Sequence, residues 1–334
     1  MKIGITYNLR DDVNTSRYIE GSSEDAYEEF DSSATVDAIG KVLQGHGHEI
    51  VKLGFGRAAV ELLLKEKVDF VFNIAEGYFG RSREAHIPAL LEMMGIPYTG
   101  PDPLTASMTL DKITAKRIAS QAGIAAPSHI VIWPWQEVDY KGVRFPVILK
   151  PAWEGSSKGI RLKSKVDNPD EMEDVLKHLR TSYRREPIVA EQFISGRELT
   201  VGMIGNGEAE VFGIMEIKPK SKKDENFIYS LEVKRDYVKL VDYVCPADIS
   251  DHTRKRIERL VLQLFDVFGC RDVSRFDFRL DSRGTPHFIE VNVLPGLNPV
   301  SGDIVIMAKL LGVSYNELVT RIFEQALTRY DRSG

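Results

Sequence analysis

Three oxygen-bearing side chains near the C-terminal end of the sequence have the types and spacing of a divalent-metal site. Asp277 lies in one apolar run, Glu290 and Asn292 lie in the next, and Asp281-Ser282-Arg283-Gly284 between them is typical of a hairpin turn. Side chains two positions apart on a strand share a face, so Glu290 and Asn292 point together and Asp277 reaches them from the partner strand. Carboxylate and amide oxygens are ligands that Mg²⁺ takes, alongside waters and phosphate oxygens.

The alternative is a hairpin whose polar face is solvated. Apolar residues such as Phe288, Val291 and Val293 flank the acids, which predicts a half-buried hairpin. A buried acid needs a partner, and the single Arg275 nearby cannot neutralise all three positions. Metal binding is therefore the favoured interpretation.

A second candidate site is the Gly-rich segment 154–159, Glu-Gly-Ser-Ser-Lys-Gly, which follows a predicted strand ending at Lys150. Small residues let backbone N–H groups approach phosphate oxygens closely. The segment lacks the Walker A spacing, and no dinucleotide fingerprint occurs in the sequence, which disfavours a Rossmann dehydrogenase. Alone it could be a plain turn, but together with a Mg²⁺ site it indicates a nucleoside triphosphate.

A Pro-Gly turn directly follows the proposed metal ligands. It places the Gly296 N–H and the Ser301 hydroxyl near the reacting centre, where such donors suit a developing oxyanion.

Length and composition limit the remaining classes. The 334 residues are enough for two or three domains, and a net charge of −5 gives no sign of a nucleic-acid or anionic-membrane partner. The two cysteines do not indicate a disulfide framework. The sequence contains no stretch of 18 apolar residues, so we expect no membrane span. The N-terminus does not resemble a signal segment, so we expect a cytoplasmic protein.

Apolar periodicity predicts an α/β start followed by α+β units. Strand and helix alternate up to residue 73, which argues for a small parallel sheet. The predicted strands are Lys2–Tyr7, Glu49–Leu53, Asp69–Asn73, Ser128–Ile132, Pro146–Lys150, Ile188–Phe193, Leu199–Ile204, Glu210–Ile217, Asp272–Leu280 and Pro286–Val293. One predicted helix begins after the possible N-caps at 31–33. The other predicted helices are Ala58–Lys67, Thr105–Ala122, Asp170–Arg180, Thr253–Phe268 and Tyr315–Tyr330.

These elements divide into three predicted units, residues 1–100, 101–195 and 196–334. The segment 10–29 is long, polar and unpatterned, and loops of that length tend to be functional, so we expect a lid on the substrate side.

Taken in order, these motifs resemble the ATP-grasp superfamily and, within it, the D-alanine–D-alanine ligase family, of which this chain looks like a divergent member. The resemblance covers nearly the whole chain. It rests on residues 95–100, 111–112, 150–151, 154–157, 196–200, 245–247, 275–277 and 290–296. It implies an N-terminal parallel-sheet domain and a nucleotide held between central and C-terminal α+β subdomains.

The resemblance also implies roles for individual residues. The ATP-binding residues would be Lys112, Lys150, Ser156, Ser157, Glu191, Phe193 and Glu198. Asp277, Glu290 and Asn292 would carry two Mg²⁺ ions, with Mn²⁺ as an alternative. The catalytic residues would be Arg275, Gly296, Ser156 and Lys234, and Ser301 would hold the second substrate's carboxylate. Related ligases are commonly homodimers.

Departures from the family pattern concern the amino-acid pocket. Glu76 stands where the family has a His. Arg81 and Arg83 stand where the family motif usually continues with an acidic residue and a Gly. Arg235, which follows Lys234, replaces a Tyr. The family's N-terminal Glu could be Glu28 or Glu29. We therefore expect Glu76, Arg81, Arg83, Arg235 and Ser301 to contact substrate.

The implied reaction is ATP-dependent joining of two amino acids through an acylphosphate. The alternatives are a ligase for another carboxylate and amine in specialised metabolism, rather than cell-wall synthesis, and a non-catalytic ATP-binding module.

Overall fold

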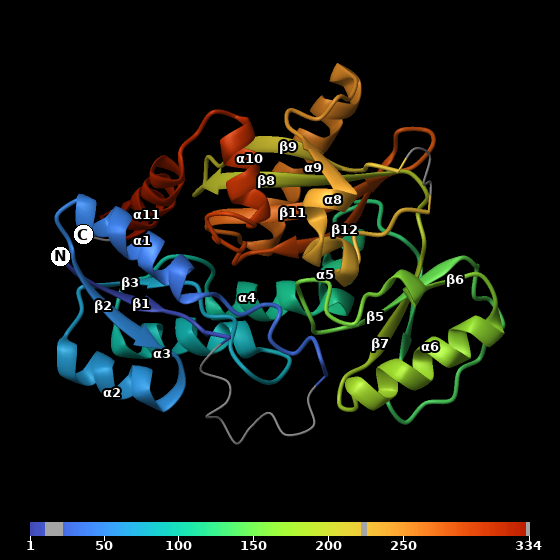
Figure 1. Cartoon of the computed structure of the whole chain (residues 1–334), viewed down its shortest axis with the longest axis horizontal. Helices are drawn as coiled ribbons and strands as arrows, with labels where there is room; N and C mark the ends of the chain where they lie inside the picture. The colour runs from blue at the N-terminus through green and yellow to red at the C-terminus, as the bar shows by residue number, and fades with distance from the viewer. Residues whose placement is uncertain (11–22, 222–225, 332–334) are drawn as a thin grey trace.

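The computed structural model describes residues 1–10, 23–221 and 226–331 of the chain, and its elements gather around three separate sheets (Figure 1). One sheet is parallel and two are antiparallel. The predicted combination of α/β and α+β parts is confirmed. The boundaries at residues 100 and 195 stay a prediction.

The N-terminal sheet has the order β2-β1-β3. Its strands are β1 (Lys2–Thr6), β2 (Glu49–Gly54) and β3 (Phe70–Asn73), and its helices are α1 (Ser33–Gly45), α2 (Gly56–Glu66) and α3 (His86–Met94). Ser32 caps α1 by accepting the Thr35 N–H, as the sequence predicted. The last helix of the chain, α11 (Tyr315–Asp331), packs through Phe323 against Ile3 and Phe70 in the same core, so the two ends of the chain meet.

The central sheet has the order β4-β7-β5-β6. Its strands are β4 (His129–Ile132), β5 (Val147–Pro151), β6 (Lys165–Val166) and β7 (Ile188–Gln192), covered on one face by α6 (Pro169–Ser182). Lys150 and Glu191 lie on neighbouring strands, which fixes their distance from each other.

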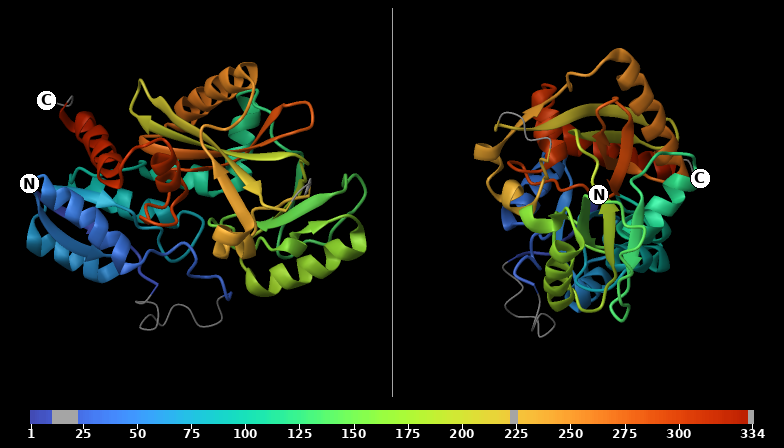
Figure 2. Two further views of the ribbon diagram at one scale, coloured as in Figure 1. Left: turned by 45° about the horizontal axis from the view of Figure 1, so that its top comes forward. Right: turned by 90° about the vertical axis from the view of Figure 1, so that its right-hand side faces the viewer.

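The five-stranded sheet has the order β10-β9-β8-β11-β12. Its strands are β8 (Arg197–Gly205), β9 (Glu210–Pro219), β10 (Val241–Val244), β11 (Asp272–Leu280) and β12 (Pro286–Asn292). The helix α9 (Asp251–Phe268) covers one face (Figure 2), and Met307 of α10 (Asp303–Leu310) packs against Gly202 and Gly213 on the other. The short helices α7 (Leu231–Arg235) and α8 (Tyr237–Leu240) lie between β9 and β10 in the chain.

The helix predicted over residues 105–122 is two helices, so that prediction was wrong. The chain forms α4 (Pro103–Leu110) and α5 (Lys112–Gln121), and Asp111 between them is extended, with φ −78° and ψ 100°. The Asp111 carboxylate accepts the Thr114 N–H at 2.8 Å and so starts a new helix. Breaking the helix there lets the Lys112 N–H donate to the Ala152 carbonyl beside the Gly-rich segment.

Among the described residues, the α-helices α3, α7, α8 and α10, the strands β6 and β10 and the short 3₁₀ turns at 83–85 and 162–164 were not predicted. Within the described ranges, no helix has the length and apolar character that a membrane span requires.

Candidate active site

The predicted hairpin is confirmed, and its register brings the three proposed metal ligands together. Asp277 of β11 pairs directly with Glu290 of β12, and Arg275 pairs with Asn292. The Asn292 amide donates to the Asp277 carboxylate at 3.3 Å. Both carboxylates and the amide oxygen therefore converge on one face of the hairpin.

Opposite charges surround these acids. Arg275 donates to Asp277 at 2.9 and 3.1 Å, and the Thr200 hydroxyl donates at 2.6 Å. Burial raises the pKa of Asp277 despite the Arg275 charge. Burial would also raise the pKa of Glu290, but the Lys112 ammonium 3.5 Å away, with other nearby cations, lowers it to about 2.

This donor set fits Mg²⁺. Two carboxylates and one amide supply hard oxygen ligands and leave positions for phosphate oxygens and water, the arrangement in which proteins usually hold this ion. Nowhere in the described ranges do three or more His, Cys, Asp or Glu side chains gather in an arrangement suited to a metal ion. The hairpin remains the candidate metal site of this structure.

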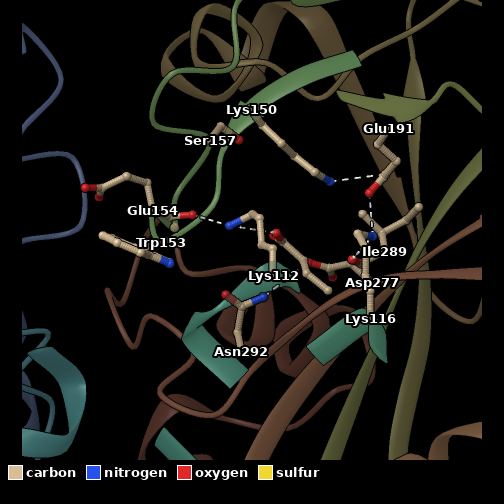
Figure 3. A network of polar contacts seen from close by, with 12 residues as sticks. Lys112, Lys116, Lys150, Trp153, Glu154, Ser157, Glu191, Asp277, Ile289 and Asn292 are labelled. Carbon is tan, nitrogen blue, oxygen red and sulfur yellow. Dashed lines mark hydrogen bonds and ion pairs between the residues drawn. The ribbon is translucent and has the colours of Figure 1, made fainter. Parts of the chain in front are cut away.

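Lys116, a buried lysine that the sequence analysis did not predict, lies beside the proposed ATP-binding residues. Glu191 lies between Lys150 at 3.1 Å and Lys116 at 2.5 Å, and Lys116 also donates to the Ile289 carbonyl at 2.9 Å (Figure 3). The Lys116 side chain is 0% exposed. Its position four residues after Lys112 places both lysines on one face of α5, which is a signal that the sequence offered.

One cavity between the central and five-stranded sheets contains most of the predicted ATP-binding residues. Its lining includes Lys150, Ser156, Ser157, Glu191, Phe193 and Glu198. The guanidinium of Arg279 lies 4.7 Å from the centre of the Phe193 ring and donates to Glu198 at 2.9 Å. Lys112, the remaining predicted residue, lines the adjoining cavity.

The Gly-rich segment 154–159, which we call the phosphate loop, has a left-handed backbone at Ser156 and Ser157, with φ of 48° and 60°. A side chain at Gly155 would clash with Glu29, because a Cβ there would lie 2.6 Å from the Glu29 carboxylate. Ser157 donates to the Tyr229 carbonyl at 3.0 Å. The loop is thus a defined structure rather than a plain turn.

Glu29 joins the phosphate loop to the N-terminal part of the chain. Arg83 donates to both Glu29 oxygens at 2.8 Å, the Gly155 N–H donates at 2.5 Å, and Lys158 lies 3.2 Å away. The Arg83 and Glu29 side chains are 4% and 3% exposed. Burial alone would raise the pKa of Glu29, but the charges of Arg83 and Lys158 lower it to about 2.

The described end of the predicted lid, residues 23–29, therefore contacts the phosphate loop. Asp25 adds a second link by accepting the Gly159 N–H at 2.9 Å. Residues 11–22 of the predicted lid lie outside the described residues.

A second cavity adjoins the nucleotide cavity and contains part of the predicted substrate set. Its lining includes Glu76, Gly296 and Ser301. Ser156, Lys234, Arg275 and Glu290 line both cavities.

Three of the predicted substrate residues do not line this cavity. Arg81 pairs with Asp111, Arg83 is held by Glu29, and Arg235 donates to Glu28 at 3.0 Å. Their substrate roles stay a prediction, and the geometry offers a structural role for each.

Comparison with known proteins identifies the family. A family model described as "D-ala D-ala ligase C-terminus" matches residues 127–324. A D-alanine–D-alanine ligase of Geobacter sulfurreducens is 31% identical over 305 residues, covering 91% of this chain and 92% of that protein. The chain belongs to the D-alanine–D-alanine ligase family. An uncharacterised protein of Sinorhizobium fredii is 32% identical over 306 residues, covering 89% of each chain.

Solved structures agree on the fold of this family member. A D-alanine–D-alanine ligase of Bacillus anthracis, solved in complex with ATP, superposes with a TM-score of 0.74 at 21% identity, covering 100% of both chains. A D-Ala:D-Ser ligase of Enterococcus faecalis gives a TM-score of 0.72 at 21% identity, covering 97% of this chain and 99% of that one. The predicted ATP-grasp architecture and the family resemblance are both confirmed.

Proposed function

We propose that this D-alanine–D-alanine ligase family member is an ATP-dependent carboxylate–amine ligase that joins two amino acids. The observation that carries the proposal is the pair of adjoining cavities. One is lined by Lys150 and Ser157, and the other is lined by Lys112 and by acidic and hydrogen-bonding groups. Ser156, Lys234, Arg275 and Glu290 line both. A triphosphate in the first cavity and a carboxylate in the second would meet at these residues.

In the first step, an oxygen of the substrate carboxylate attacks the γ-phosphorus of ATP, and the bond to the ADP oxygen breaks. An acylphosphate and ADP result. Lys112, Lys150 and Arg275 offset the negative charge of the transferring group. Asp277, Glu290 and Asn292 would hold Mg²⁺, which supplies charge neutralisation on the phosphate oxygens when it is bound.

In the second step, the amine of the other amino acid attacks the acyl carbon, loses a proton, and phosphate leaves with one oxygen of the original carboxylate. The Gly296 N–H and Arg275 hold the oxyanion, and Ser301 holds the carboxylate of the incoming amino acid. Removing one such donor typically costs ~10²–10³ in rate.

Water must be kept from the acylphosphate in between. The phosphate loop reaches the junction of the two cavities through Ser156, and Glu29 and Asp25 hold the loop by accepting its backbone N–H groups. Ser156 and Lys234, which line both cavities, lie at this junction. A closed loop in that position excludes water from the intermediate.

The names of the relatives make D-alanine the first substrate to test. Glu76 and Arg235, which stand where the family pattern has other residues, support a different amino-acid pair as the alternative. A non-catalytic ATP-binding protein is disfavoured because the paired acids Asp277 and Glu290 have no need to converge in such a protein. The homodimer and the cytoplasmic location stay predictions.

The test is a phosphate-release assay with ATP and Mg²⁺ against D- and L-amino acids, singly and in pairs, followed by mass spectrometry of the product. The proposal expects ADP, phosphate and a dipeptide in equal amounts from at least one pair, and none from Glu290→Ala. ATP binding without turnover on any amino acid would favour the non-catalytic alternative and overturn the proposal.

A further inference from the structure

Three acids of the second cavity, which we call the substrate cavity, differ from its other acids because they have no cationic partner within 4.0 Å in the described part of the chain. These acids, which we call the acid trio, are Asp31, Glu76 and Glu84, and all three line the cavity. Within the described ranges, no nitrogen of a Lys, Arg or His side chain lies within 4.0 Å of any of their carboxylates. The remaining carboxylates of the lining do have such partners: Glu28, Glu29, Glu154, Glu290 and Asp303.

The chain is folded so as to bring two of these acids together. Glu76 follows β3, and Glu84 lies eight residues later in the short 3₁₀ turn η2 (Arg83–Ala85). Gly77, at φ +76°, lies against the Arg83 carbonyl so closely that a Cβ would stand 2.5 Å from its oxygen. Only a glycine permits this contact, which returns η2 to the end of β3.

Glu84 is the most informative member of the acid trio. It is only 9% exposed, its side chain borders the cavity, and no backbone N–H or basic side chain among the described residues donates to it. Its hydrogen-bonding partner is the carboxyl of Glu76, another acid. Two buried acids that share a hydrogen bond have no cation of the described residues within 4.0 Å to balance an ionised carboxylate, and an uncompensated buried charge is costly.

Burial is the largest cause that raises the pKa of all three groups, and it outweighs the opposing charges of Arg83 on Glu76, of Arg83 and Lys112 on Glu84, and of Arg10 on Asp31. Burial, with the charges of Glu84 and Glu29, raises the pKa of Glu76 well above its usual value. Burial also raises the pKa of Glu84 and of Asp31 to about 7. A cation bound beside these acids would oppose these shifts by stabilising the ionised carboxylates.

We propose that the acid trio binds a cationic side chain, so that one of the two amino-acid substrates is a diamino acid or another basic amino acid. This rests on the proposed ligase function and names its substrate class. The α-ammonium of an ordinary amino acid supplies one positive charge, whereas three unpaired acids in one cavity call for more. A second ammonium or a guanidinium on the same substrate supplies it, and charge-assisted hydrogen bonds of this kind are among the stronger ones in proteins.

The test compares substrates that differ only in the side-chain charge. Ornithine and lysine are measured against norvaline and norleucine, each as the D and L forms, by phosphate release with ATP and Mg²⁺. The wild-type protein is expected to favour ornithine over norvaline, and lysine over norleucine, by ~10–100-fold in kcat/KM. Glu84→Gln and Glu76→Gln should each reduce that preference at least tenfold while leaving the KM for ATP unchanged.

Glu61→Gln, an exposed acid on α2, is the matched control and should keep the preference. Each Gln variant has nearly the same shape as Glu and removes an unpaired acid, so the melting temperature should not fall. Equal use of charged and neutral side chains by wild type would overturn the inference, as would a preference that survives both substitutions.

A binding measurement separates this inference from the proposed function. Calorimetry with ornithine or lysine, in the presence of Mg²⁺ and a non-hydrolysable ATP analogue, measures binding of the amino acid to the acid trio without turnover. Binding that is lost in Glu84→Gln, together with no turnover on any amino acid, would support the site and refute the ligase. Absence of both binding and turnover would refute both.

Discussion

The buried carboxylate of Glu29 gives the sharpest prediction about the phosphate loop. Its partners, Arg83, Lys158 and the Gly155 N–H, lower its pKa from 4.5 to about 2. At about 1.4 kcal/mol for each pKa unit, the ionised group contributes ~3 kcal/mol at neutral pH to the folded arrangement of Glu29 with Arg83 and the loop. Glu29→Gln keeps the shape and removes this contribution, while Glu154 still pairs with Arg83 at 3.5 Å and also with Lys158.

Hydrogen exchange of the amides of the phosphate loop, residues 154–159, measures this free energy locally. At pH 7 the substitution should lower their protection by ~100-fold, since 1.4 kcal/mol corresponds to a factor of ten. The folded pKa lies below the ordinary value, so the contribution is complete above pH 4.5 and is lost as pH falls towards 2. The ratio between wild type and variant should therefore shrink to ~10-fold at pH 3.

Glu28→Gln is the matched control. Glu28 pairs with Arg235, whose side chain is 46% exposed, and such exposed pairs contribute little. The control should change loop protection by less than ~5-fold. The reasoning about Glu29 fails if Glu29→Gln leaves loop protection unchanged, or if the wild-type advantage is as large at pH 3 as at pH 7.

Three further substitutions test the rest of the site. Glu290→Gln should reduce ATP turnover by at least ~10² because a metal ligand is lost, and near wild-type turnover would remove Glu290 from the metal site. Lys116→Met should raise the KM for ATP by ~10-fold with little change for the amino acid, because Lys150 alone then neutralises Glu191. The exposed Lys177→Met on α6 serves as its control, and equal KM values for ATP would refute this role. Arg275→Lys should lower kcat by ~10²–10³ through loss of the forked contact to Asp277 and the contact to Asp303, whereas unchanged kcat would place the oxyanion elsewhere.

The metal hairpin could be predicted from the sequence because its signals are local. Two apolar runs separated by a turn specify a hairpin, and the period of two on each strand puts Glu290 and Asn292 on one face. The register that pairs Asp277 with Glu290 agrees with that expectation. Lys116 was not predicted, although the sequence contains a signal for it. Its spacing of four residues from Lys112 places both lysines on one face of α5.

The contacts of Arg83 could not be predicted, because they join residues far apart in the sequence. Arg83 meets Glu29 and Glu154, which lie 54 and 71 positions away, and no periodicity links such positions. The break at Asp111 was missed for a different reason. The residues on both sides favour helix, and the break depends on two contacts: the Thr114 N–H donates to the Asp111 carboxylate, and the Lys112 N–H donates to the distant Ala152 carbonyl.

The most direct test of the central claim is the fate of the carboxylate oxygens. An amino acid that is turned over is labelled with ¹⁸O in its carboxylate, and the phosphate released from ATP is analysed by mass spectrometry. Attack of a carboxylate on ATP followed by attack of an amine predicts one ¹⁸O atom in each phosphate and one left in the new amide. Phosphate that carries oxygen from water alone, with both labels still in the amino acid, would contradict the account.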